Sequence, residues 1–166
     1  PTPGFSNKVS DNLYIIDSYK DSIYDRIGRQ DLKSNRYRYS DVPYYVMKKY
    51  VEDTYEERLD KLSNDFLYAR LGANYTGYNP LDRFSKNQIV PSEEDTYYRY
   101  QTIQGYVHDM GAAMQGGVGG HAGLFSNAND IAKIMQMYLQ QGYYGGTQFF
   151  TYRTVEKFNK SYFCDK

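Results

Sequence analysis

Eight residues in the second half of the chain constrain its fold more than any other segment. Residues 116–123 read Gly-Gly-Val-Gly-Gly-His-Ala-Gly, and five of the eight are glycine. Glycine adopts positive φ without steric cost and weakens regular helices and strands. The segment lacks the Lys-Ser/Thr ending of a P-loop and the GxGxxG spacing of a dinucleotide-binding turn. It predicts an irregular stretch that approaches its neighbours closely before a helix, rather than a nucleotide site.

The rest of the sequence is dominated by helical spacing of apolar residues. A helix is expected from Val42, and a second over 55–70, ending at Gly72. A third is expected from Ser126 as N-cap to Gly142. The first helix is expected to bury Tyr44, Met47, Tyr50 and Val51, and the second Leu59, Leu62, Phe66 and Leu67. The remaining segments are expected as loop (1–12), strand (13–16), helix (21–28), long irregular stretch (73–91), extended chain (98–107) and helix start (154–158). The predicted fold class is mainly α with short β segments (α+β).

The composition excludes several functional classes. Among 166 residues, 20 Lys plus Arg balance 20 Asp plus Glu, so no basic field exists to attract nucleic acid or an anionic membrane. No window approaches the roughly 20 apolar residues of a membrane-spanning helix. The single cysteine, Cys164, cannot form an internal disulfide. The start at Pro1, without an initiator Met or signal peptide, is interpreted as the start of a piece of something longer.

Histidine and tyrosine offer two further candidate sites. His108 and His121 are the two histidines, and neither lies in an HExxH or CxxC arrangement. Hydrogen bonding near a turn is therefore preferred over a metal site, and no metal or cofactor is predicted. The 21 tyrosines could form a sugar-binding platform. Many of them, however, fall at helical core spacing, such as Tyr44, Tyr50 and Tyr138, so most are predicted to be half-buried packing residues.

The segment Tyr39-Ser40-Asp41 directly precedes the first predicted helix. A tyrosine serves as a general base only when neighbouring cations lower its pKa from about 10. Arg36 and Arg38 are close in sequence. The same three residues are equally well explained as a helix start, with Ser40 or Asp41 as the cap. The residues alone leave both interpretations open.

Two segments together resemble one family. Residues 37–47, Tyr-Arg-Tyr-Ser-Asp-Val-Pro-Tyr-Tyr-Val-Met, resemble the Tyr-x-Asn region of serine hydrolases in the class C β-lactamase and penicillin-binding-protein superfamily. Residues 105–109 and 116–126 resemble the segment of that superfamily that ends in Gly-His-Ala-Gly-Leu-Phe-Ser. The similarity is greatest to the esterase-like branch, in particular to the β-lactamase-like domains that Bacteroidetes attach to family 3 glycoside hydrolases.

The resemblance implies a mechanism and assigns residues to it. In that family, the serine of a Ser-x-x-Lys motif attacks the substrate. The lysine of that motif and the tyrosine of Tyr-x-Asn both take part in the proton transfers of the serine, and water cleaves the acyl-enzyme that results. Tyr39 then occupies the general-base position, and Asp41 replaces the asparagine, whose amide would donate a hydrogen bond that a carboxylate can only accept. The family segment also contains residues that are expected to be structural: His108, Asp109, Gly120, His121 and Gly123.

Other parts of the family pattern are missing. No serine in the sequence has a lysine three residues later, so the nucleophile is absent. His121-Ala122-Gly123 is not taken as the family's His-x-Gly element, because that element lies further downstream on a strand. Residues 1–166 are therefore expected to be a single partial domain, the helical middle part of a β-lactamase/DD-peptidase-like fold with most of its antiparallel sheet missing.

Function, partners and location follow as expectations. The parent is expected to hydrolyse an ester or amide, such as a peptidoglycan peptide or a β-lactam, in the periplasm or otherwise outside the cytoplasm, and the chain alone is expected to be inactive. The alternative is a non-catalytic module that binds cell-wall glycan or a fused glycoside hydrolase. Missing strands would leave apolar stripes uncovered, so self-association is also expected.

Overall fold

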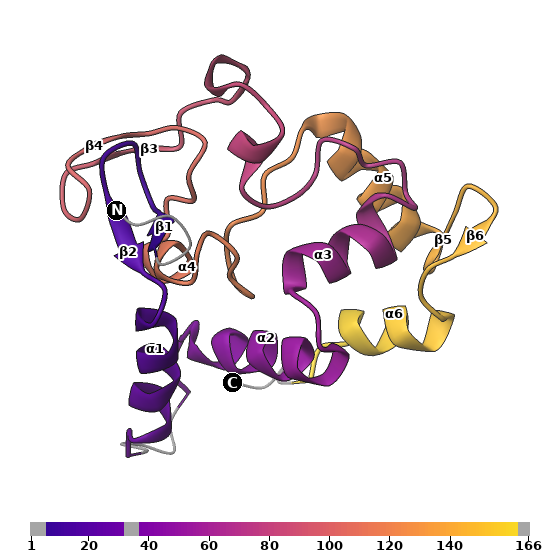
Figure 1. Ribbon diagram of the computed structural model, residues 1–166. Coiled ribbons are helices and arrows are strands. Elements are labelled where there is room, and N and C mark those ends of the chain that lie inside the picture. The colour runs from indigo at the N-terminus through magenta and orange to yellow at the C-terminus, as the bar shows by residue number, and fades with distance from the viewer. Residues whose placement is uncertain (1–5, 32–36, 163–166) are drawn as a thin grey trace. The chain divides into compact units, whose positions relative to one another are not determined.

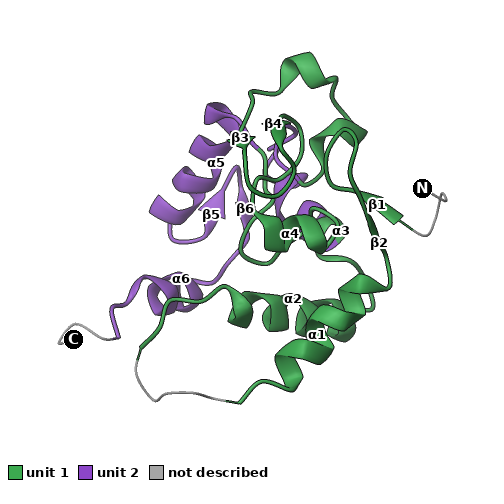
Figure 2. Cartoon of the chain, turned by 90° about the vertical axis from the view of Figure 1, so that its left-hand side faces the viewer, with its two compact units in different colours: residues 1–61, 78–125 green, residues 62–77, 126–166 purple. Residues whose placement is uncertain are grey.

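The computed structural model describes residues 6–31 and 37–162. They form two compact units (Figure 2). Unit 1 comprises residues 1–61 and 78–125, and unit 2 comprises residues 62–77 and 126–166. Helices and two-stranded antiparallel pairs make up both units, which confirms the predicted α+β class. No helix in the described ranges is long and apolar enough to cross a membrane.

Unit 1 starts with a short hairpin and continues into two helices (Figure 1). Strand β1 (Ser6–Lys8) pairs antiparallel with β2 (Tyr14–Ile16), with Ser6 opposite Ile16. The sequence predicted β2 but placed residues 6–8 in a loop, because a three-residue polar strand has no apolar alternation to reveal it. The remaining elements of unit 1 are α1 (Tyr19–Gly28), α2 (Val42–Tyr55), the 3₁₀ turns η2 (Pro80–Asp82) and η3 (Lys86–Gln88), β3 (Glu93–Asp95), β4 (Gln101–Ile103) and α4 (Met110–Met114).

Helix α2 begins where the sequence predicted but buries a different face. Pro43 lies in its first turn, where the missing N–H has no helical partner. The predicted inward residues Tyr44, Met47 and Tyr50 are exposed, whereas Lys48 is only 8% exposed. The prediction of the buried face was therefore wrong, because the apolar residues of this helix are not the ones that its neighbours cover. Tyr44 and Tyr50 are also more exposed than the half-buried state predicted for most tyrosines.

The core of unit 1 is small and is held by one buried ion pair. Val9, Val107, Ala112 and Ala113 form its apolar cluster, with Leu13, Ile15 and Ala122 against them. Beside them the Arg99 side chain is fully buried and donates from Nε to Asp95 at 2.7 Å. Its Nη1 atom donates to the carbonyl of Val107 at 2.6 Å, and its Nη2 atom donates to the carbonyl of His108. Arg99 thus joins β3 to the segment that leads into α4.

Unit 2 contains the helical segment that precedes Gly72 and the helices that follow the glycine-dense stretch. Tyr68, Leu71, Ala73 and Met137 form its core. Asp130, 2% exposed, accepts from the backbone N–H of Tyr75 at 2.6 Å and ties the loop at 73–77 to α5. The elements are α3 (Leu59–Ser63, beginning in unit 1), the π-turn η1 (Asn64–Tyr68), α5 (Ala128–Leu139), β5 (Tyr143–Tyr144), β6 (Thr147–Gln148) and α6 (Tyr152–Asn159).

Several boundaries in the second half differ from the sequence predictions. The helix expected over 55–70 is the short α3 followed by a π-turn, and Phe66 is exposed rather than buried. The N-cap of α5 is Asn127, whose side chain accepts from the N–H of Asp130 at 2.9 Å, rather than Ser126. Gly72 and Gly142 have positive φ as predicted, but the helical elements before them already end at Tyr68 and Leu139. The extended segment expected over 98–107 contains regular strand only at Gln101–Ile103.

Candidate active site

The segment Tyr39-Ser40-Asp41 forms the entrance to α2. Tyr39 is 80% exposed. The Oγ atom of Ser40 accepts from the N–H of Val42 at 3.3 Å, and the Asp41 carbonyl accepts from the N–H groups of Tyr44 and Tyr45. Ser40 and Asp41 therefore start the helix, as one of the two open interpretations stated. The Asp41 side chain caps nothing, which leaves its carboxylate available to face other groups.

A second pair of predicted residues meets at the start of α4. Asp109 is the N-cap of this helix and accepts from the N–H of Ala112 at 2.7 Å. Its same oxygen lies 2.8 Å from Nε2 of His121. The His121 side chain is 5% exposed, and its ring lies 4.7 Å from the ring of Tyr45 on α2. Since an ionised carboxylate can only accept, Nε2 of His121 carries the hydrogen of this bond.

Asp41 completes a three-residue cluster with this pair. One oxygen of Asp41, one of Asp109 and one ring nitrogen of His121 lie within 4.8 Å of one another. Three such groups can hold a divalent cation, although an ion on Nε2 of His121 would have to displace its hydrogen. Within the described ranges, Nδ1 of His121 is buried without a hydrogen-bond partner. The sequence predicted each of the three residues but contained no signal that they converge, because Asp41 and Asp109 are 68 positions apart in the chain.

The cluster changes the ionisation of its members. Burial raises the pKa of Asp109, but the N–H of Ala112 and the hydrogen bond from His121 outweigh it and leave this pKa below its usual value. Burial also raises the pKa of the Tyr45 hydroxyl, and the carboxylates of Asp109 and Asp41 raise it further. Tyr45 therefore stays protonated at neutral pH and acts as an uncharged wall beside His121.

The other predicted residues lie around the cluster without joining it. His108 is exposed, and its backbone carbonyl accepts from Arg99. Gly123 has φ +109°, and a Cβ there would lie 2.4 Å from the Gly117 carbonyl oxygen, so the glycine-dense stretch folds back on itself. A Cβ on Gly120 would lie 2.4 Å from the carbonyl oxygen of Tyr44. The stretch is irregular and closely packed, as the sequence predicted, and its partner is the first turn of α2.

Gly120→Ala is expected to lower the free energy of unfolding by about 1–3 kcal/mol, because the new methyl group meets backbone that cannot move aside alone. Urea denaturation followed by circular dichroism measures the change. The matched control is Gly28→Ala at the end of α1, where a Cβ would meet nothing within 4 Å. That control is expected to be neutral or stabilising. An equal effect of both substitutions would contradict the close approach of Gly120 to α2.

Sequence reasoning missed two contributors to this region. Tyr45 was not singled out, and Arg99 with Asp95 was not noticed as a pair. The spacing of Asp95 and Arg99 is i,i+4, which was the available signal. It was weak, because such pairs usually lie on exposed helix faces, whereas this one is buried in a turn.

Comparisons with known proteins identify the family of the chain. No protein-family model matches it. Over 175 residues it is 37% identical to a protein of Escherichia coli strain K12 named "Putative D-alanyl-D-alanine carboxypeptidase", and the alignment covers 96% of this chain and 40% of the relative. A protein of Salmonella typhi with the same name is 35% identical over 138 residues, which cover 76% of this chain and 32% of the relative.

A solved structure adds the fold. The crystal structure of a "putative beta-lactamase" from Bacteroides dorei DSM 17855 matches with a TM-score of 0.54 over 92% of this chain and 40% of that chain, at 15% identity. The chain belongs to the superfamily of β-lactamases and penicillin-binding proteins. The predicted family and the predicted fold class are thus confirmed, whereas the esterase-like branch and the link to family 3 glycoside hydrolases stay predictions.

This β-lactamase-like chain is shorter than the proteins that it matches. It spans about 40% of the length of the Escherichia coli relative and 40% of the Bacteroides structure.

Proposed function

We propose that this chain supplies the catalytic tyrosine, and the scaffold that positions it, to a β-lactamase-like serine hydrolase acting on acyl-D-Ala-D-Ala peptides or related amides and esters. The observation that carries the proposal is the exposed Tyr39, which lies two residues before Asp41, the N-cap of α2 and a member of the cluster with Asp109 and His121. The relatives named D-alanyl-D-alanine carboxypeptidases support the substrate class. Such peptides belong to peptidoglycan, so the reaction would take place outside the cytoplasm.

The proposed roles follow from the contacts of each residue. Tyr39, with its side-chain oxygen deprotonated, accepts the proton of the attacking serine hydroxyl while the serine oxygen bonds to the substrate carbonyl carbon. That proton then passes to the amine or alcohol that leaves as its bond to the carbonyl carbon breaks, and water later cleaves the acyl-enzyme. Asp109 and His121 act as positioning residues, because their hydrogen bond joins the start of α4 to the glycine-dense stretch that packs on α2. The carboxylate of Asp41 accepts a hydrogen bond from a cationic lysine or from substrate, in place of an amide donor.

The serine of such a reaction is not among these 166 residues, because no Ser-x-x-Lys motif occurs in the sequence. The isolated chain is therefore expected to form no covalent adduct with a fluorescent penicillin. Gel fluorescence and intact mass spectrometry after incubation check this result. A stoichiometric adduct would show that a nucleophile resides in this chain and would contradict the assigned role.

A chimera tests the proposed function directly. In it, the matched segment of the Escherichia coli relative is replaced by this chain, so that the flanking parts come from the relative. The chimera is expected to bind fluorescent penicillin covalently and to release D-alanine from an acyl-D-Ala-D-Ala peptide. A chimera that folds, as judged by circular dichroism, but neither labels nor turns over would contradict the proposal and favour the non-catalytic binding module.

A further inference from the structure

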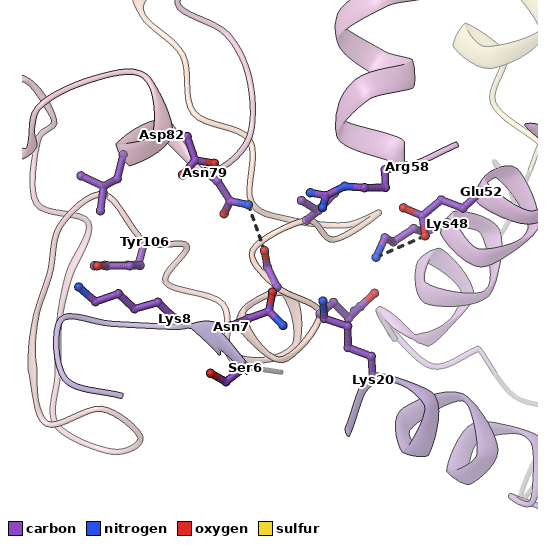
Figure 3. Close-up of a pocket in the computed structure, with 15 residues that line it drawn as sticks. Ser6, Asn7, Lys8, Lys20, Lys48, Glu52, Arg58, Asn79, Asp82 and Tyr106 are labelled. Atoms are coloured by element: carbon purple, nitrogen blue, oxygen red, sulfur yellow. Dashed lines mark hydrogen bonds and ion pairs between the residues drawn. The ribbon is translucent and has the colours of Figure 1, made fainter. Parts of the chain in front are cut away.

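A pocket of about 490 Å³ lies within unit 1, apart from the cluster of Asp41, Asp109 and His121. Its walls come from β1, α1, α2, the residues before α3, η2 and the glycine-dense stretch (Figure 3). The volume falls in the range of small-molecule sites, about 300–1,000 Å³. None of the residues proposed for the hydrolase site lines it.

The charged groups of the pocket are mainly cationic. Four basic side chains line it, Lys8, Lys20, Lys48 and Arg58, against two acidic ones, Glu52 and Asp82. Figure 3 shows Lys20 on α1, Lys48 on α2 and Arg58 in the turn before α3 directed toward the same part of the pocket. Because the whole chain has no net charge, this local excess of positive charge is a property of the pocket and not of the protein as a whole.

Lys48 is the most unusual of these residues. It is 8% exposed and forms an ion pair with Glu52 at 3.6 Å, a distance longer than that of a direct hydrogen bond. An ammonium group carries three N–H donors. Removing it from water is costly unless those donors find partners. A ligand anion in the pocket would supply them.

The other cations are held in place with donors to spare. Arg58 uses Nε and Nη2 for a bidentate pair with Asp60, at 2.9 and 2.7 Å, which leaves Nη1 free to contact a ligand. Lys20 pairs with Asp17 at 3.2 Å. These ion pairs already restrict the conformations of the two long side chains. Each side chain therefore loses less conformational entropy when a ligand binds, and the pocket is partly preorganised.

The glycine-dense stretch makes one wall of this pocket. Asn79, in a left-handed conformation at φ +45°, donates from its side chain to the Gly116 carbonyl at 3.1 Å. A Cβ on Gly117 would lie 2.1 Å from Oδ1 of Asn79, and one on Gly116 would lie 3.0 Å from Nζ of Lys20. Glycine at these two positions therefore leaves room for polar side chains at the wall, without the backbone pattern of a P-loop.

We propose that this pocket binds a small molecule carrying at least two negative charges on phosphate or carboxylate groups, with Lys20, Lys48 and Arg58 contacting the anion. The uncharged part of the ligand would form hydrogen bonds with the polar side chains that line the rest of the pocket, namely Asn7, Asn79 and Asp82. The site does not depend on the hydrolase function proposed above.

The lowered pKa of Lys48 makes the proposed anion binding dependent on pH. Burial lowers the pKa of Lys48, Glu52 raises it, and Lys20 and Arg58 lower it further. A bound anion favours the protonated ammonium, so binding should weaken as the pH rises toward the usual lysine pKa of about 10.4 and the lysine loses its proton. A neutral ligand would show no such dependence.

Isothermal titration calorimetry of the 166-residue chain tests the proposal with three probes at low ionic strength. Inorganic pyrophosphate represents phosphate ligands, citrate represents carboxylate ligands, and trehalose is the neutral control. Saturable 1:1 binding of one or both anions, without binding of trehalose, is the expected result, and the stronger anion identifies the source of the charge. Absence of saturable binding of either anion up to millimolar concentration would overturn the proposal.

Two adjacent lysines on α2 provide a matched pair of variants. Lys48→Met is expected to weaken anion binding about tenfold, since it removes a charge-assisted contact. Lys49→Met removes the same charge from an exposed position outside the pocket and should leave the affinity within about twofold. Equal weakening by both variants would indicate non-specific surface attraction and overturn the site. If Lys48→Met fails to fold, Lys20→Met replaces it, with the same expectation.

Discussion

Phenylalanine in place of Tyr39 is expected to lower acylation of the chimera by fluorescent penicillin, and its release of D-alanine, by about 10²-fold. The substitution removes one hydroxyl oxygen and little else, because Tyr39 is 80% exposed. General-base catalysis depends on that oxygen, whereas the start of α2 depends on Ser40 and on the carbonyl of Asp41. The fold should therefore be unchanged while the proton-transfer step is lost.

The control for Tyr39→Phe lies two residues earlier. Tyr37 is 90% exposed, and Tyr37→Phe removes the same atom from the same segment. Initial rates of acylation for both variants, measured at equal protein concentration, should differ by the full factor. Comparable activity of the two variants would show that the hydroxyl of Tyr39 takes no part in the reaction, and the proposed catalytic role would have to be withdrawn.

Arg99→Met is expected to lower the free energy of unfolding by about 3–5 kcal/mol. The methionine fills similar space but leaves the Asp95 carboxylate buried without its cation. It also leaves the carbonyls of Val9, Val107 and His108 without their donor. Chemical denaturation at pH 7 measures the change, and Arg29→Met at the exposed C-cap of α1 is the control, expected within about 0.5 kcal/mol of the parent chain. Equal effects of the two substitutions would argue against the buried network.

The same pair sets the response to acid. The Arg99 guanidinium and the N–H groups of Tyr98 and Tyr97 hold the pKa of the Asp95 carboxyl well below its usual range. Because the folded pKa lies below the unfolded value of about 4, the stabilisation is complete above that pH and is lost as the pH falls below it. In Arg99→Met the main cause of the depression is gone, so the acid-dependent part of the unfolding free energy should shrink.

The sequence predicted where α2 begins correctly, but it did not predict which side chains of that helix are buried. Pro43 marked the start of α2 correctly, because such a signal acts within one helical turn. The buried face of α2 was predicted wrongly, because the pattern of apolar residues does not reveal which side its neighbours cover. Lys48, the residue that is buried there, looked like one more solvated charge.

For the predicted site residues too, the sequence identified the residues but not how they pack together. Tyr39, Asp41, Asp109 and His121 were all chosen from the sequence through the family resemblance, and the chain does belong to that superfamily. Their catalytic roles stay predictions. Asp41 lies close to Asp109 and His121 because segments about 70 residues apart in the chain come into contact, and the sequence did not predict that contact.

By itself, then, the sequence determined the α+β class, the start of α2 and an irregular, close-packed glycine-dense stretch, since these follow from backbone freedom and nearest neighbours along the chain. The tertiary structure decided what that stretch packs against. Gly120 meets the first turn of α2, and Gly116 and Gly117 leave room for Lys20 and Asn79 at the wall of a cationic pocket. Such contacts depend on how distant segments meet in space, and a one-dimensional pattern of residue types does not encode that meeting in any local signal.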